Sequence, residues 1–229
     1  MKNSIINRGV VKKIANALGD INNRAVYVGG AIVSMYADDP AADDVRPTKD
    51  LDITLEIASF SDLANLQEEL SKKGFNPHPE ENVICRFKYE DVLVDVMATE
   101  QIGWAPSNEW FKPGFAALQS LNVDGIEIRI LPLSYFLATK FSAFHGRAID
   151  PRTSHDFEDI AYILDNRLNL VEEILNSPED VRTFLQGEFH QILTQRDLQE
   201  AVLGNLYYET QSKRFEMMTA KLKKITGSH

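Results

Sequence analysis

Two aspartates stand two positions apart at the start of an alternating stretch, KDLDITLEI, at residues 49–57. Side chains two residues apart in a β-strand point to the same face, so Asp50 and Asp52 would lie together, opposite the leucine and isoleucine side chains. Paired carboxylates are hard oxygen donors of the kind that bind Mg²⁺. The stretch equally fits an ordinary half-exposed strand with a polar outer face, and the pattern alone leaves both interpretations open.

A third carboxylate, Asp95, interrupts the apolar stretch VLVDVMA at residues 92–98. A lone carboxylate among so many β-branched residues is costly to bury without a partner. Either its face of the strand is partly exposed, or a cation lies beside it. If this strand neighbours the strand of Asp50 and Asp52, the three carboxylates would form an oxygen-rich site suited to Mg²⁺, which completes its shell with water and substrate phosphates.

A lysine occupies an inward position of the helix predicted for LSYFLATKFSAFHGR. Lys140 lies four residues after Phe136 and four before Phe144, within the apolar stripe. Lysine is almost never fully buried without a partner. Its stem would reach solvent, or its ammonium would meet an anion such as a phosphate. The next predicted helix begins with Asp156 and Asp159, and acids in a first turn also favour the helix dipole.

Two adjacent glycines, Gly29 and Gly30, lie between a predicted strand and a predicted helix. Main chain without side chains can approach a phosphate closely, and a helix N-terminus favours an anion. The third glycine of a dinucleotide fingerprint and the Gly-Lys-Ser/Thr of a P-loop are both absent. The turn therefore indicates a phosphate contact outside those two classes.

The elements that would position these residues change character after Pro132. Before it, helices are predicted at 4–18, 31–37 and 61–73, the last capped by Ser59 or Ser61, and strands at 24–28, 50–57, 83–89, 92–98 and 125–131, with a polar loop at 37–48. After it, helical spacing predicts helices at 133–145, 155–166, 169–176, 179–193, 196–208 and 211–224. We therefore predict an α+β domain at 1–131 and a helical domain at 132–229.

The composition of the 229 residues is that of a globular protein, with 44% hydrophobic residues and a net charge of −10. Such a chain lacks the broad basic surface of nonspecific nucleic-acid binders. Residues 213–224 carry five basic side chains and one acid, which fits a solvated helix face or an RNA-contacting tail. No apolar run approaches the ~18 residues of a membrane helix, and the N-terminus does not resemble a signal peptide. A single cysteine, Cys85, excludes an internal disulfide and indicates a reducing compartment, so we expect a cytoplasmic protein.

Together the segments VYVGGAIVSMY, RPTKDLDITLEI and VLVDVMA resemble the nucleotidyltransferase core of the DNA polymerase β superfamily, over roughly residues 25–165. The closer resemblance is to the AbiEii-like, abortive-infection branch. Its members share GGAIVSMY, RPTKDLDI and a lysine-bearing helix (here ATKFSAFHGR) followed by an Asp-rich helix start (here SHDFEDI). The resemblance implies a nucleotidyltransferase fold, a mixed β-sheet flanked by helices, and a helical region that completes the nucleotide-binding cleft.

The resemblance also assigns roles by position. The carboxylates that it implies to be catalytic and to hold two Mg²⁺ ions are Asp50, Asp52 and Asp95. The residues that it implies to bind the nucleotide are Gly29, Gly30, Lys140 and Asp156. Asp159 is expected to be structural. The sequence departs from the family pattern in the loop before Asp50, which carries an inserted DDPAADDV and is a candidate specificity loop.

The expected activity is therefore Mg²⁺-dependent transfer of an NMP from an NTP to the hydroxyl of a tRNA or protein acceptor. The resemblance adds the expectation of a toxin with an antitoxin partner. One alternative is a small-molecule nucleotidyltransferase of the aminoglycoside type, because an acidic cleft attracts a polycation. The other is a non-catalytic nucleotide-binding module with the same fold.

Overall fold

The computed structural model describes residues 2–48, 50–78, 85–147 and 149–228. The chain divides into two compact units. The first comprises residues 1–32 and 46–132, and the second comprises residues 33–45 and 133–229. The first contains the strands and the second is helical, which confirms the predicted α+β fold class. The segment 33–45, which contains most of the predicted polar loop at 37–48, belongs to the helical unit.

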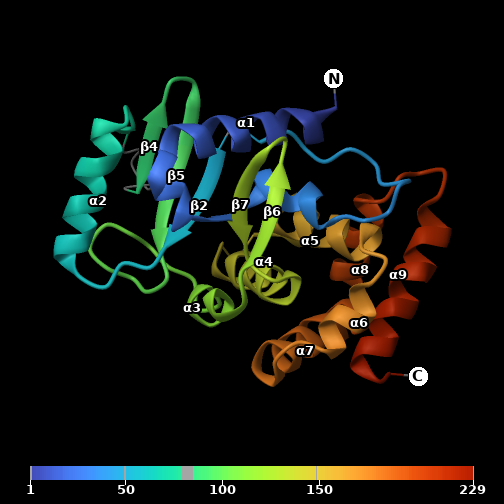
Figure 1. The fold of residues 1–229 in the computed structure, drawn as a ribbon. Coiled ribbons are helices and arrows are strands. Elements are labelled where there is room, and N and C mark those ends of the chain that lie inside the picture. The colour runs from blue at the N-terminus through green and yellow to red at the C-terminus, as the bar shows by residue number, and fades with distance from the viewer. Residues whose placement is uncertain (1, 49, 79–84, 148, 229) are drawn as a thin grey trace. The chain divides into compact units, whose positions relative to one another are not determined.

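A mixed seven-stranded sheet organises the described part of the first unit, in the order β3-β4-β5-β2-β1-β7-β6 (Figure 1). The strands are β1 (Val26–Val28), β2 (Asp50–Leu55), β3 (Asn76–Pro77), β4 (Arg86–Tyr89), β5 (Val92–Ala98), β6 (Gln119–Val123) and β7 (Ile126–Ile130). Strand β2 lies parallel to β5 and antiparallel to β1, which in turn lies parallel to β7. The central position of β2 places its two aspartates in the middle of the sheet.

Strand β2 has the predicted apolar face, because Leu51, Ile53 and Leu55 are buried in the core. On the predicted polar face Asp50 and Asp52 are half-buried, whereas Thr54 is fully buried. The strand ends at Leu55, two residues before the predicted end. Two strands were not predicted, β3 and β6. Strand β6, QSLNV, has one buried residue and lies at the edge of the sheet, so it lacks the alternating apolar pattern that identifies a half-buried strand. The predicted residues 83 and 84 of the strand before β5 lie outside the described residues.

Two helices of the first unit supply apolar side chains to its core. Helix α1 (Asn3–Leu18) lies across the sheet, and α2 (Phe60–Lys72) lies toward the side of β3 and β4 (Figure 1). Ser59 caps α2, since its hydroxyl accepts a hydrogen bond from the Asp62 amide at 3.1 Å. The helix predicted at 31–37 is instead a 3-10 helix, η2 (Gly30–Tyr36), and a short α3 (Phe111–Gly114) was not predicted.

The second unit is a set of packed helices that the apolar spacing predicted to within a few residues. They are α4 (Leu133–Arg147), α5 (His155–Asn166), α6 (Leu170–Leu175), α7 (Glu179–Thr194), α8 (Arg196–Gly204) and α9 (Gln211–Thr226). Helix α4 packs against α5 and α7, and the ring of Phe141 meets that of Phe189 edge-on with centroids 6.0 Å apart. Helix α8 ends four residues before its predicted end.

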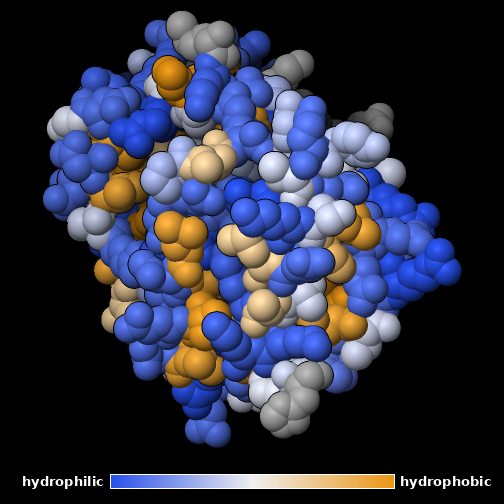
Figure 2. Space-filling view, turned by 90° about the vertical axis from the view of Figure 1, so that its right-hand side faces the viewer, coloured by the Kyte–Doolittle hydropathy of each residue, from blue (hydrophilic) through white to orange (hydrophobic). Residues whose placement is uncertain are grey.

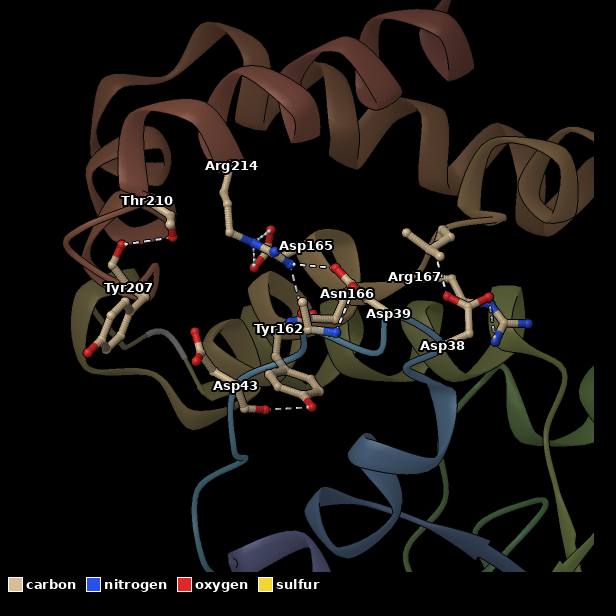
Figure 3. A network of polar contacts seen from close by, with 12 residues as sticks. Asp38, Asp39, Asp43, Tyr162, Asp165, Asn166, Arg167, Tyr207, Thr210 and Arg214 are labelled. Atoms are coloured by element: carbon tan, nitrogen blue, oxygen red, sulfur yellow. Dashed lines mark hydrogen bonds and ion pairs between the residues drawn. The ribbon is translucent and has the colours of Figure 1, made fainter.

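The basic C-terminal helix α9 uses part of its charge inside its own unit (Figure 3). The Arg214 Nε donates to both oxygens of Asp165 at 2.7 Å, and its Nη2 reaches Asp39 at 3.1 Å. The Lys221 ammonium donates to three main-chain oxygens at the end of α5, those of Leu164, Asp165 and Arg167. Two of the five basic side chains in residues 213–224 therefore have structural partners.

Contacts with helix α5 hold the start of the polar loop within the helical unit. The amides of Asp38 and Asp39 both donate to the Asn166 carbonyl at 3.1 Å. Further along, the Tyr162 hydroxyl donates to the Asp43 carbonyl at 3.1 Å (Figure 3). The candidate specificity loop is thus held by hydrogen bonds to its main chain and by two arginines, Arg167 at Asp38 and Arg214 at Asp39.

The surface drawn in Figure 2 is mainly hydrophilic, with apolar side chains in small groups. Among the described residues, no helix combines the length and apolarity needed to span a bilayer.

Low pH should weaken the contacts through which Asp39 holds the polar loop. The Ala41 amide, which donates to Asp39 at 2.8 Å, and then the Arg214 guanidinium lower the pKa of Asp39 below its ordinary value. A depressed folded-state pKa contributes stability that is present above the unfolded pKa and is lost as the pH falls through the folded one. Asp39→Asn should therefore lower the thermal unfolding temperature at pH 7, and the difference from wild type should shrink below about pH 4.

Thermal unfolding from pH 3 to pH 7 measures this difference. Asp43→Asn is the matched control, because it removes an exposed carboxylate from the same loop and keeps the carbonyl that Tyr162 uses. A gap between Asp39→Asn and wild type that stayed constant down to pH 3 would contradict the assignment.

Candidate active site

Three carboxylates lie on one face of two neighbouring strands. In the parallel pair β2–β5, Asp52 stands directly opposite Asp95. Residues in register on adjacent strands point to the same face, and Asp50 shares that face because it is two residues before Asp52. The strand of Asp50 and Asp52 and the strand of Asp95 are therefore neighbours in the sheet, as predicted.

A guanidinium lies among these carboxylates. Arg86 on β4 is in register with Asp95 on its other side, in the antiparallel pair β4–β5. Its Nε lies 2.7 Å from Asp95 Oδ1, and its Nη2 lies 2.8 Å from Asp95 Oδ2 and 3.1 Å from Asp50 Oδ2. The side chains of Arg86 and Asp95 are 10% and 14% exposed, whereas that of Asp50 is 41% exposed. Arg86 thus bridges two of the three predicted metal ligands from a largely buried position.

The donor set suits a divalent ion, although the carboxylates are not arranged around one. Among the described residues, no group of three or more His, Cys, Asp or Glu side chains has the arrangement that would hold a metal ion. The chemistry of the donors nevertheless fits Mg²⁺, because all three are carboxylates and Asp50 is accessible to solvent and substrate. The difference from the predicted site is the guanidinium, which occupies the space between Asp50 and Asp95.

The first glycine of the pair supports one of these carboxylates. Gly29 follows β1 with a φ of +73°, and a Cβ built on it would lie 1.8 Å from Asp52 Oδ2. No side chain fits in that space, and a positive φ is also unfavourable for other residues. Gly30 begins η2. The Gly-Gly turn and the Asp52 carboxylate are therefore in direct contact, which the sequence could not show.

The second predicted group, around Lys140, forms a buried ion cluster in the helical unit. The Lys140 Nζ lies 2.8 Å from Asp159 and 3.2 Å from Asp156, and its side chain is 8% exposed. Arg147 of the same helix also pairs with Asp156. The inward position of Lys140 is as predicted, and its ammonium does not reach solvent. The anions beside it are carboxylates of α5, and Asp159 has the structural contact expected of it.

Two histidines and the single cysteine have ordinary structural surroundings. His145 pairs with Glu188 at 2.9 Å, and the exposed His155 pairs with Glu158 at 3.1 Å. The Cys85 thiol is buried, and burial followed by the charge of Asp95 raises its pKa to about 11. A thiol with that pKa stays protonated at neutral pH, so it lacks the reactivity of a nucleophilic cysteine.

Arg86 is the site residue that the sequence interpretation missed. A signal existed, because a tight turn at Glu90-Asp91 pairs Tyr89 with Val92 and, three residues out on each side, Arg86 with Asp95. The alternation of the second strand drew attention to Asp95 alone. Counting the register of the hairpin would have placed the cation beside the carboxylate.

A comparison with solved structures gives matches that include the following two. A nucleotidyltransferase-like antigenic protein from Paracoccidioides brasiliensis is 18% identical, with a TM-score of 0.51 over 86% of this chain and 91% of that chain. The solution structure of the antibiotic-resistance factor ANT(2'')-Ia is 13% identical, with a TM-score of 0.48 over 82% of this chain and 96% of that chain. A search of curated proteins found no match.

The family comparison covers most of the chain. Residues 21–224 match the model of the nucleotidyl transferase AbiEii toxin family of type IV toxin–antitoxin systems. That match includes the Gly-Gly turn, the three carboxylates and the Lys140 cluster. The chain therefore belongs to the AbiEii nucleotidyltransferase toxin family.

Proposed function

We propose that this protein transfers a nucleoside monophosphate from an NTP to an acceptor hydroxyl in a reaction that depends on Mg²⁺. The observation that carries the proposal is the row of carboxylates on β2 and β5, with the Gly29 main chain against one of them. Membership of the AbiEii family supports the same reaction class. In this proposal Asp50, Asp52 and Asp95 would hold the metal, which when bound neutralises phosphate charge and activates the hydroxyl.

The chain's own groups then have distinct tasks. The acceptor oxygen forms a bond to the α-phosphorus while the bond to the bridging oxygen breaks, so pyrophosphate leaves with the electron pair. Asp95 is the proposed acceptor of the hydroxyl proton, which requires one of its oxygens to be released from Arg86. Gly29 and Gly30 are proposed to let the triphosphate approach the main chain closely, because glycine has no side chain.

The acceptor that we favour is a tRNA or a protein hydroxyl, with an antitoxin as the regulatory partner, because the family is that of type IV toxins. A small polycationic acceptor of the aminoglycoside type is the second candidate, favoured by the net charge of −10. Incubation with each α-labelled NTP, Mg²⁺ and either total RNA, total protein or an aminoglycoside distinguishes them. Transfer of label with pyrophosphate release identifies the acceptor class, and its absence with all of them would favour a non-catalytic module.

Asp52→Asn is expected to reduce label transfer by about a thousandfold or more, because it removes a charge from the centre of the carboxylate row. The fold should persist, since Asn has the same shape and Asp52 is not in the apolar core. Circular dichroism checks the fold, and the transfer assay checks the activity. Turnover near the wild-type rate in the folded variant would contradict the mechanism.

Gly29→Ala is expected to reduce transfer by at least about a hundredfold, because the added methyl group would displace the Asp52 carboxylate and strain a positive φ. Gly9→Ala is the matched control. Gly9 lies in α1 with nothing within 4 Å of its added Cβ, so that variant should keep both activity and stability. Equal activities of the two variants would show that the turn does not support the site.

Lys140→Met is expected to lower the free energy of unfolding by about 3 kcal/mol, because it leaves two buried carboxylates without their shared cation. Urea unfolding measures the loss. Arg147→Gln is the control and should cost about 1 kcal/mol or less, since Arg147 is 60% exposed.

We further propose that Lys140 contacts the triphosphate and that Asp156 beside it is a second acid of the nucleotide site. At a temperature where Lys140→Met stays folded, its affinity for the NTP that the wild type uses should fall by about tenfold or more. Unchanged NTP affinity would leave Lys140 with a structural role alone.

A further inference from the structure

We propose that Arg86 is a positioning residue that stands in for a divalent cation. Its guanidinium holds the carboxylates of Asp50 and Asp95 together while no metal ion is bound, and metal binding displaces it from Asp50. The inference rests on the proposed function, because it takes these carboxylates to be metal ligands.

One nitrogen atom of Arg86 lies between the two carboxylates. The Arg86 Nη2 lies 2.8 Å from Asp95 Oδ2 and 3.1 Å from Asp50 Oδ2, so it bridges one oxygen of each carboxylate. A magnesium ion binds oxygen at about 2.0–2.1 Å. An ion that shared these two oxygens would lie against the nitrogen, and the two positive charges would repel. The guanidinium and the ion therefore exclude each other between Asp50 and Asp95.

This face of the sheet carries a concentration of negative charge. Asp52 and Asp95 face each other across β2 and β5, and like charges directly opposite each other destabilise a sheet. Asp50 adds a third carboxylate two residues away. Arg86 continues the row on the far side of Asp95 and is the cation that offsets this repulsion. The folded sheet thus needs a positive charge here whether or not a metal ion is present.

The two contacts of Arg86 differ in length and exposure. Arg86 binds Asp95 through two nitrogens at 2.7 and 2.8 Å, and that carboxylate is 14% exposed. It binds Asp50 through one nitrogen at 3.1 Å, and that carboxylate is 41% exposed. The longer and more hydrated contact costs less to break, so the guanidinium should leave Asp50 first. An arriving ion can then approach Asp50 from solvent.

Mn²⁺ binding to the full chain tests the inference without any measurement of catalysis. Free Mn²⁺ is followed by electron paramagnetic resonance during titration of wild type, Arg86→Gln and Lys88→Gln. Lys88 is exposed and shares a strand face with Arg86, so its removal takes the same charge from β4 without opening the Asp50–Asp95 bridge. Arg86→Gln should bind Mn²⁺ about tenfold more tightly than wild type, equivalent to about 1.4 kcal/mol, and Lys88→Gln should bind like wild type.

A thermal unfolding series provides the second measurement. Without metal, Arg86→Gln should unfold at a lower temperature than wild type, because the carboxylates repel without their counter-ion. Added Mn²⁺ should raise its unfolding temperature more than that of wild type. A purely structural role for Arg86 would lower stability but would not tighten Mn²⁺ binding.

The outcomes separate this inference from the function on which it rests. In one outcome, wild type binds Mn²⁺, Asp52→Asn abolishes the binding, and Arg86→Gln binds Mn²⁺ equally or more weakly. That result would overturn the proposal that Arg86 stands in for the cation and would keep the proposed function. No Mn²⁺ binding to any variant would overturn both. If Arg86→Gln does not fold, Arg86→Lys replaces it. Lysine keeps the charge but lacks the planar fork that bridges two carboxylates, so affinity should rise by about threefold, and unchanged affinity would overturn the inference.

Discussion

Repulsion between carboxylates on neighbouring strands is the constraint on which the site depends. Asp52 faces Asp95 across β2 and β5, and Asp50 lies two residues away on the same face. A sheet that carries three acids in this way requires a cation within reach of them. Here Arg86 provides it from β4, through contacts with Asp95 and Asp50. The antiparallel hairpin of β4 and β5, which sets the register of Arg86, is thus as much a part of the site as the parallel pair that carries the acids.

The same solution recurs in the helical unit. The chain has 24 basic and 34 acidic residues, so each buried acid competes for few cations. Lys140 is placed between Asp156 and Asp159, and Arg214 between Asp165 and Asp39. These cations connect helices with one another and with the loop. The inward lysine of α4 and the basic stretch of α9 therefore have structural partners, in addition to any role in ligand binding.

For a nucleotidyltransferase of the AbiEii family, a site that carries its own counter-ion has a consequence for activation. In the mechanism that we propose, the guanidinium and a divalent ion would compete for the same oxygens, so readiness for catalysis would depend on the ion and not only on the nucleotide. The position of the Asp52 carboxylate also requires glycine at residue 29, because a side chain there would occupy the space of that carboxylate. Both conditions are local to the first unit, where the turn after β1 and the centre of the sheet meet.

The sequence by itself determined the α+β class, the apolar face of β2, most helices of the second unit, and the identity of the three carboxylates, because these follow from periodicity and from single residues that break it. The edge strand β6 was not predicted, because its side chains are mostly exposed and show no alternation of apolar and polar residues. Only the tertiary structure decided that 33–45 joins the helical unit, that Gly29 touches Asp52, and that Arg86 bridges Asp50 and Asp95. Those facts depend on strand order and on contacts between residues far apart in the chain. The pairing of Arg86 with Asp95 could be counted from the register of their hairpin, but the contact of Arg86 with Asp50 could not, because local patterns do not show which strands become neighbours.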